Sequence, residues 1–184
     1  MARTNSNMVP LGTKAKDFKL YDTVSKTTVS FNQLKGSLGT IILFICNHCP
    51  YVIHINPILT KISKKYKKTG INIVAISSND IDKYPQDGPL EMTKHAKKNK
   101  YDFPYLFDET QSVAKIYDAA CTPDIYLYNL NNILVYRGQI DDSRPGNNIP
   151  LSGNDLINAI KCLIKKEENK KIQKPSIGCN ITVS

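Results

Sequence analysis

A chain of 184 residues is long enough to bury a core of its own, and its 41% hydrophobic and 22% charged residues exclude a disordered protein. The formal charge of +9 would favour association with acidic partners. No apolar run is long enough to span a membrane, and the polar start lacks the apolar segment of a secretory signal. We therefore expect a cytoplasmic protein with no membrane partner.

The first half of the chain predicts a strand–helix–strand unit after an N-terminal arm over residues 1–16. Residues 17–22 predict an edge strand, and the β-branched run 39–46 predicts a buried strand. A helix containing Pro57 follows, and Gly70 ends it. Its apolar stripe has helical spacing: Val52, Ile55, Leu59, Ile62 and Tyr66.

The second half adds further strands and helices. Residues 71–77 predict a second buried strand, parallel to the first through a right-handed crossover. A helix over 89–99, a short strand over 103–107 and a helix opened by residues 108–111 follow. Residues 124–138 predict a hairpin with a two-residue turn, Asn131-Asn132.

The closing part of the chain predicts an amphipathic helix and then a tail over residues 169–184. The helix places Leu156, Ile160 and Leu163 on one face. This order of elements predicts one α/β domain, residues 1–184, with a mixed central sheet flanked by helices.

The lysines gather in three bursts, at 64–68, 94–100 and 165–171. A nucleic-acid surface would add a recognition motif or a stacking platform, and the sequence has neither. We interpret these bursts as solvated helix faces and expect no nucleic-acid partner.

The five cysteines are odd in number and widely spread, which argues against the disulfide framework of a secreted domain. They are Cys46, Cys49, Cys121, Cys162 and Cys179. A close pair in a reducing compartment is more often catalytic or metal-binding than structural. Zinc needs two more ligands, usually a second close pair, and the other cysteines stand alone, so we expect no metal.

Cys46 ends the predicted buried strand, and Cys49 opens the predicted helix. A helix N-terminus stabilises a thiolate, so we expect a lowered pKa for Cys46, attack by Cys46 and resolution by Cys49. Pro50 suits the first helical turn. Between the cysteines lie Asn47 and His48, and His48 either favours the Cys46 thiolate when protonated or points into solvent. Two inert core thiols are disfavoured, because such a junction is exposed at its tip.

Thr122-Pro123 precedes the predicted hairpin. A proline at the entry to a sheet beside a functional loop is a candidate cis bond, and a trans proline at a strand start is the alternative. The residues alone favour neither.

These features together resemble the thioredoxin fold. The stretches CNHCPYVIHI, SSNDIDKYPQDGP, FPYLFDETQSVAKIYDAACTPDIYLY, LVYRGQIDDSRP and PSIGCNI resemble, more closely, the peroxiredoxin-like proteins of the alkyl hydroperoxide reductase/thiol-specific antioxidant family. The likeness runs from about residue 10 to residue 181.

The resemblance implies a site around Pro123. Pro123 would be cis and packed against the cysteine pair, and Thr122 would offer backbone groups to an extended thiol partner by strand addition. Cys121 would lie near the site, and Cys179 would be a candidate auxiliary thiol that also approaches it. For both, buried packing is the slightly favoured alternative.

One departure separates this chain from peroxiredoxins that carry P-x-x-x-[TS]-x-x-C. The hydroxyl position is Leu43 if Cys46 is the peroxide-reacting cysteine, and Cys46 itself if that cysteine is Cys49. Arg137 and Arg144 are candidate sources of positive charge, although such arginines are more often exposed on loops.

The sequence therefore predicts a thiol–disulfide oxidoreductase that needs no cofactor. Its partners would be a dithiol reductant, either a thioredoxin-type protein or a small thiol, and a disulfide or peroxide substrate. A peroxiredoxin-like peroxidase acting through Cys46 is the first alternative. A redox-sensing or binding module without turnover is the second. The sequence does not give the oligomeric state.

Overall fold

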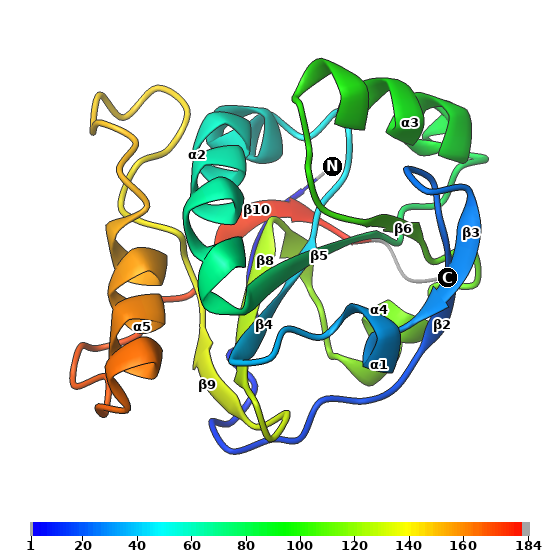
Figure 1. Ribbon diagram of the computed structural model, residues 1–184. Helices are drawn as coiled ribbons and strands as arrows, with labels where there is room; N and C mark the ends of the chain where they lie inside the picture. The colour runs from blue at the N-terminus through cyan, green and yellow to red at the C-terminus, as the bar shows by residue number, and fades with distance from the viewer. Residues whose placement is uncertain (1, 182–184) are drawn as a thin grey trace.

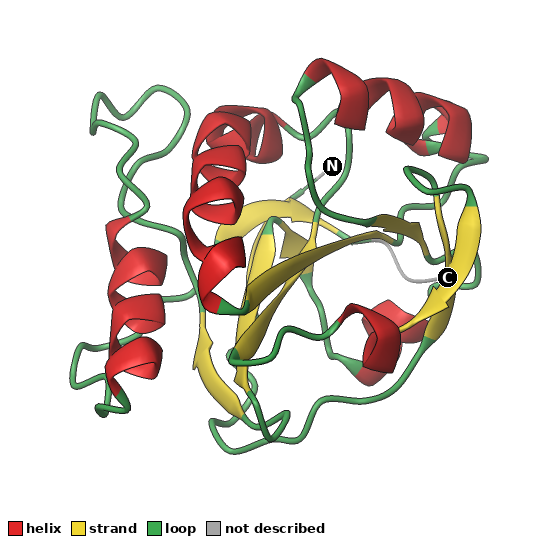
Figure 2. Ribbon diagram, viewed as in Figure 1, coloured by secondary structure: helices red, strands yellow, loops and turns green. Residues whose placement is uncertain are grey.

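A computed structural model describes residues 2–181, and a mixed seven-stranded sheet lies at their centre (Figure 1). The strand order is β3-β2-β6-β5-β4-β8-β9. Helices cover both faces of this sheet (Figure 2). One core cluster packs side chains of α2, α3 and α5 against the sheet, and a second packs those of α1 and α4 on the opposite face. The predicted α/β class with a mixed, helix-flanked sheet is confirmed.

The bounds of the elements follow. The strands are β1 (Arg3–Asn5), β2 (Lys19–Asp22), β3 (Thr27–Ser30), β4 (Gly39–Phe44), β5 (Ile71–Ser77), β6 (Tyr105–Phe107), β7 (Cys121–Thr122), β8 (Asp124–Asn129), β9 (Leu134–Arg137) and β10 (Ile177–Asn180). The α-helices are α1 (Phe31–Leu34), α2 (Pro50–Tyr66), α3 (Pro89–Lys98), α4 (Ser112–Ile116) and α5 (Asn154–Lys165). Two 3-10 turns are η1 (Lys67–Thr69) and η2 (Pro85–Asp87).

The strand β4 is the centre of the fold and leads directly into the cysteine pair. All of its residues are buried, because Ile41 and Leu43 face one core cluster while Ile42 and Phe44 face the other. It pairs in parallel with β5 and antiparallel with β8. The predicted parallel crossover is confirmed, and it places the end of β4 at the N-terminus of α2.

The helix α2 buries the whole predicted apolar stripe against the sheet. Pro50 is its first residue, where a missing N–H costs little, and Pro57 lies inside it. After the turn η1, Gly70 adopts a left-handed conformation with φ of 86° and leads the chain into β5.

Two local predictions were wrong. The strand β2 is not an edge, since it pairs with both β3 and β6 and leaves β3 outermost. The hairpin of β8 and β9 turns over residues 130–133 rather than over two residues. Asn129 explains the longer turn, because its side-chain oxygen accepts the backbone N–H groups of Asn131 and Ile133.

The predicted arm and tail each carry a strand. The arm contains β1 and the tail contains β10, and the two pair antiparallel. The other edge of β10 pairs with β7, which completes a small three-stranded sheet in the order β1-β10-β7. The strand β10 thus lies beside the residues that precede Pro123, and β1 lies along its other edge.

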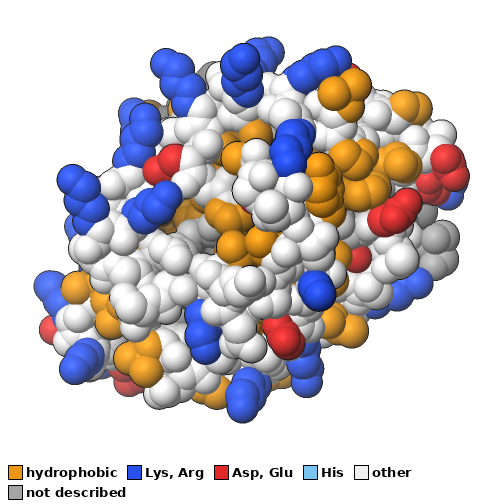
Figure 3. Space-filling view, turned by 45° about the vertical axis from the view of Figure 1, so that its right-hand side comes forward, with side chains coloured by type: hydrophobic (Ala, Val, Ile, Leu, Met, Phe, Trp, Pro, Cys, Tyr) orange, Lys and Arg blue, Asp and Glu red, His pale blue; other side chains and the backbone are white. Residues whose placement is uncertain are grey.

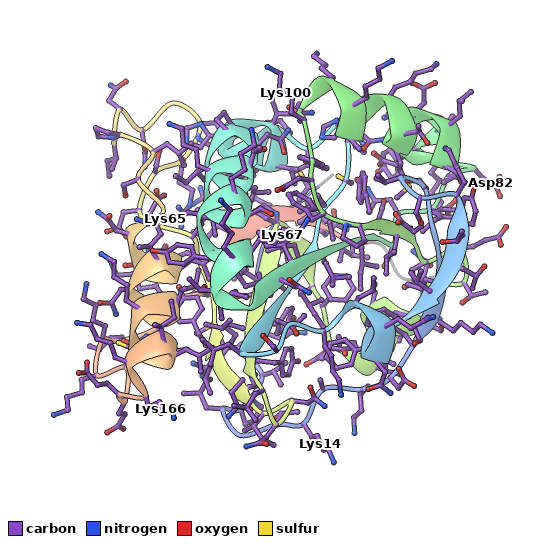
Figure 4. The ribbon with its side chains drawn as sticks, in the orientation of Figure 1. Lys14, Lys65, Lys67, Asp82, Lys100 and Lys166 are labelled. Atoms are coloured by element: carbon purple, nitrogen blue, oxygen red, sulfur yellow. The ribbon has the colours of Figure 1, made fainter. Side chains whose placement is uncertain are left out.

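The basic side chains are scattered over the molecule. Figure 3 shows Lys and Arg dispersed over the visible face, and the exposed Lys14, Lys65 and Lys166 lie on separate parts of the molecule (Figure 4). Among the described residues, no helix is both long and apolar enough to cross a membrane.

The packing of α2 gives a stability prediction. Leu59 is fully buried in the main core, so Leu59→Ala should lower the free energy of unfolding by about 2–5 kcal/mol. Urea denaturation measures this change. Lys61→Ala, on the exposed face of the same helix, is the control and should change it by no more than about 0.5 kcal/mol. Equal effects of the two changes would contradict this packing.

Candidate thiol redox site

The junction of β4 and α2 holds both cysteines of the pair. Cys46 follows β4 by two residues, and Cys49 is the residue that caps the N-terminus of α2. Both residues have 0% exposure. The junction of β4 and α2 is therefore not exposed, contrary to the prediction, because the tail strand β10 packs against α2.

The residue Thr122 contacts both sulfurs. Its hydroxyl lies 3.4 Å from Cys46 Sγ, and its backbone carbonyl accepts a hydrogen bond from Cys49 Sγ at 3.2 Å. The Thr122–Pro123 peptide bond is cis, so this implication of the family resemblance is confirmed. The hydroxyl contact was not foreseen, since the resemblance gave Thr122 only a backbone role.

A third sulfur completes the cluster. Cys179 Sγ lies 2.8 Å from Cys49 Sγ, and the two thiols share a hydrogen bond. The strand pairing explains this contact, because Cys179 is opposite Thr122 in the register of β10 and β7. The structure thus brings three of the predicted site cysteines together.

The electrostatic environment separates the two sulfurs of the pair. Hydrogen bonding to Cys49, burial and the negative charge of Asp87 raise the pKa of Cys46 far above its usual range. The hydrogen bond with Cys46 lowers the pKa of Cys49 to about 5, and those with Cys179 and the backbone N–H of Val52 act in the same direction against burial. The structure therefore opposes the predicted lowering of the Cys46 pKa, because the Cys46 sulfur is hydrogen-bonded to Cys49 and buried beside Asp87.

His48 points neither freely into solvent nor simply toward Cys46. Its Nδ1 lies 2.7 Å from Asp87 Oδ2, its side chain is 23% exposed, and its ring stacks on Tyr84 with centroids 4.9 Å apart. When protonated, it forms an ion pair with Asp87. The Asp87 carboxylate beside Cys46 is then neutralised by the His48 imidazolium.

Asp87 was missed by the sequence reasoning. It lies in η2 and is fully buried, accepting the backbone N–H of Asn47 and the amide of Asn79, both at 2.8 Å. Asn47 also donates to the Gln86 carbonyl and accepts from the Tyr105 hydroxyl. The residues between the cysteines are therefore held by the turn η2 and the strand β6. The only available signal was that Asp87 falls in a stretch that resembles the family.

The described residues hold one group of donors with metal-ligand spacing, Cys46, His48 and Asp87, whose ligand atoms all lie within 4.8 Å of one another. Asp87 already accepts two amide hydrogen bonds and faces His48, so its carboxylate is satisfied without a metal. The arrangement thus favours an organised thiol site over a metal centre.

Among the described residues, the remaining candidates share no hydrogen bond with these sulfurs. Cys121 lies within electrostatic reach of them, since burial and the charges of Asp124, Cys49 and Cys179 raise its pKa. The Cys121 thiol is buried and donates to the Pro123 carbonyl at 3.5 Å, in keeping with packing. Cys162 is half-buried in α5. Arg137 bonds to Val9 and Gln173, and Arg144 bonds to backbone carbonyls of its own loop, so their guanidinium groups are engaged away from the cysteines.

The close approach of β10 to Thr122 gives a prediction. A Cβ on Gly178 would lie 1.9 Å from the Thr122 carbonyl oxygen, so Gly178→Ala should destabilise the protein by about 1–3 kcal/mol. Urea denaturation measures the loss. Gly88→Ala is the matched control, since its Cβ would lie 3.3 Å from the nearest atom and should cost less. An unchanged midpoint for Gly178→Ala would refute this contact.

The lowered pKa of Cys49 gives a second prediction. The ultraviolet absorbance of thiolate should rise as the pH increases through about 5, because Cys49 loses its proton there. A pH titration of the reduced protein measures this step, and Cys49→Ser should remove it. A step that persists in Cys49→Ser would assign the thiolate to another cysteine.

Several solved structures are similar to this chain. An uncharacterized conserved protein from Geobacillus kaustophilus is 46% identical with a TM-score of 0.96, and the match covers 98% of this chain and 96% of that one. A hypothetical protein from Sinorhizobium meliloti is 42% identical with a TM-score of 0.95 and 98% coverage of both chains. The thioredoxin domain of a thiol-disulfide oxidoreductase from Bacteroides vulgatus shares the fold at 19% identity, with a TM-score of 0.66 over 85% of this chain and 99% of that one. No protein with a curated description matches.

The sequence also matches a family model. The AhpC/TSA family model matches residues 11–137, which is more than half of the chain. This stretch contains the cysteine pair and Thr122-Pro123. The chain therefore belongs to the AhpC/TSA family of thiol redox proteins and has the thioredoxin-like fold.

Proposed function

We propose that the protein is a thiol–disulfide oxidoreductase in which Cys46 and Cys49 cycle between two thiols and a disulfide. The observation that carries the proposal is geometric, since Cys46 and Cys49 meet at the N-terminus of α2 and both sulfurs contact Thr122, whose peptide bond to Pro123 is cis. The lowered pKa of Cys49 supports it. A thiolate at neutral pH is both the nucleophile and the good leaving group that exchange requires. The reaction needs no cofactor beyond these sulfurs.

In the proposed cycle Cys49 attacks first, which replaces the sequence-based assignment of attack to Cys46. The Cys49 thiolate attacks one sulfur of a substrate disulfide, the substrate S–S bond breaks, and one half leaves as a thiolate that takes a proton. Cys46 then loses its proton and attacks Cys49 Sγ, which releases the second half as a thiol. The products are two substrate thiols and the Cys46–Cys49 disulfide.

The second half of the cycle returns the protein to its reduced form. A dithiol reductant, either a thioredoxin-type protein or a small thiol, exchanges with the Cys46–Cys49 disulfide and becomes oxidised. Because the Cys49 thiolate is stabilised, it leaves readily when its disulfide is attacked. The reduced form is therefore the one that the site stabilises.

A peroxidase is the second candidate, and the Thr122 hydroxyl at 3.4 Å from Cys46 Sγ favours it. That hydroxyl replaces, from another strand, the one absent from position 43. In this reaction the thiolate would cleave a peroxide O–O bond to form a sulfenic acid, and the second cysteine would then form the disulfide and release water. The engaged guanidinium groups of Arg137 and Arg144 offer no nearby charge to the peroxide.

Cysteine variants test the proposal. Cys49→Ser and the double variant Cys46→Ser/Cys179→Ser should each lower the rate of insulin or small-disulfide reduction about a hundredfold or more, because each breaks the two-step exchange. The double variant should accumulate a mixed disulfide on Cys49, detected by mass spectrometry, because Cys179 Sγ, 2.8 Å from Cys49 Sγ, is then also unable to resolve it. Cys162→Ser is the matched control and should keep the wild-type rate. Undiminished turnover by Cys49→Ser would refute the proposed pair.

Stopped-flow mixing separates the two candidate reactions. The reduced protein should react slowly with hydrogen peroxide and readily with a disulfide donor, with Cys46–Cys49 as the product in peptide mapping. Faster oxidation by peroxide would instead establish the peroxidase. A Cys46–Cys49 disulfide that neither thioredoxin nor glutathione reduces would indicate a sensing module without turnover.

A further inference from the structure

The strand β10 occupies the place beside Thr122 where an extended thiol partner was expected to add. It pairs antiparallel with β7, with Cys179 opposite Thr122 and Asn180 opposite Cys121. Gly178 permits this approach, since any side chain there would collide with the Thr122 carbonyl. The chain therefore presents its own cysteine to the site in the manner of a bound partner.

The sulfur of Cys49 lies between two other sulfurs. Hydrogen bonds with both Cys46 and Cys179 stabilise its thiolate, and Cys179 Sγ is 2.8 Å away. Thiol–disulfide exchange requires the attacking sulfur to reach the sulfur that it attacks. Cys179 meets this requirement toward Cys49 without any movement of the strand that carries it.

The three sulfurs differ in access to the surface. Cys46 and Cys49 have 0% exposure, whereas Cys179 is 7% exposed. Cys179 also lines an open pocket of about 530 Å³, together with Arg3, His48 and Tyr84. Neither Cys46 nor Cys49 lines that pocket. A reagent that enters it meets Cys179 first.

We propose that Cys179 is a third redox-active thiol, which moves the disulfide from the buried pair to this pocket. The inference rests on the proposed function, because it needs Cys46 and Cys49 to form a disulfide. The reductant of the oxidised protein would bind in this pocket and react with Cys179.

The internal step conserves electrons. Cys179 loses a proton and attacks Cys49 Sγ of the Cys46–Cys49 disulfide. The Cys49–Cys179 bond forms, the Cys46–Cys49 bond breaks, and Cys46 leaves as a thiolate that takes a proton. Burial and the negative charge of Asp87 favour the protonated form of Cys46 afterwards. No external oxidant or reductant is consumed.

The external step uses a dithiol of the class already named. One thiolate of the dithiol attacks Cys179 Sγ from the pocket, and Cys49 leaves as its stabilised thiolate. The second thiolate of the dithiol then attacks the reductant's own sulfur and releases Cys179 as a thiol. The dithiol ends as a disulfide, and all three cysteines end reduced.

Disulfide mapping of the full chain tests the inference. Wild-type protein and Cys46→Ser are oxidised with one equivalent of diamide, quenched with acid, alkylated and digested for mass spectrometry. We expect both Cys46–Cys49 and Cys49–Cys179 in the wild type, and Cys49–Cys179 as the main product in Cys46→Ser. A wild-type protein with only Cys46–Cys49, and a Cys46→Ser protein with Cys179 fully alkylated, would overturn the inference and leave the proposed function standing.

Reduction kinetics give a second measurement. Oxidised Cys179→Ser should be reduced by dithiothreitol about tenfold or more slowly than the wild type, because the dithiol must then reach a buried sulfur. Oxidised Cys162→Ser is the matched control and should be reduced at the wild-type rate. Equal rates for Cys179→Ser and the wild type would overturn the role of Cys179. A wild-type protein in which no disulfide forms at all would overturn the proposed function as well.

Discussion

The pairing of β10 with the two residues before Pro123 is the constraint on which the site depends. It takes up the free edge of Thr122, covers the end of α2 and buries both cysteines of the pair. It also requires a residue without a side chain at position 178. The strand β10 thus covers a thioredoxin-like site that would otherwise be open at the sheet edge. The same strand brings the Cys179 sulfur to the site.

The chemical difference between the two central sulfurs follows from where each one sits. Cys49 caps α2 and faces the Val52 N–H, whereas Cys46 lies on the side of Asp87. A single negative charge is therefore shared unequally within the cluster. After hydrogen bonding between the sulfurs and burial, the buried Asp87 adds to this difference from a turn that is distant in sequence.

How much of this structure the sequence predicts depends on how far apart the interacting residues lie along the chain. The elements β4, α2 and β5 follow from local periodicity and from continuous apolar runs in the sequence, and the structure confirms them. The cis bond at Pro123 came from resemblance rather than from the residues themselves. The strand β10 was not foreseen, because four residues, Ile177–Asn180, carry no periodic pattern and pair with residues more than fifty positions away. The position of Cys49 at the start of α2 agrees with the sequence prediction. The pKa order was not predicted, because it depends on hydrogen bonds among the sulfurs, on burial and on Asp87.

The small sheet has a consequence for how the cluster meets solvent. Its three strands contain only two to four residues each, and two of them belong to the ends of the chain. Such short ladders separate at a lower free energy than a central sheet, so they form a unit that opens locally while the rest stays folded. Separation of β10 from β7 would therefore expose Cys46 and Cys49 to solvent while the seven-stranded sheet stays folded.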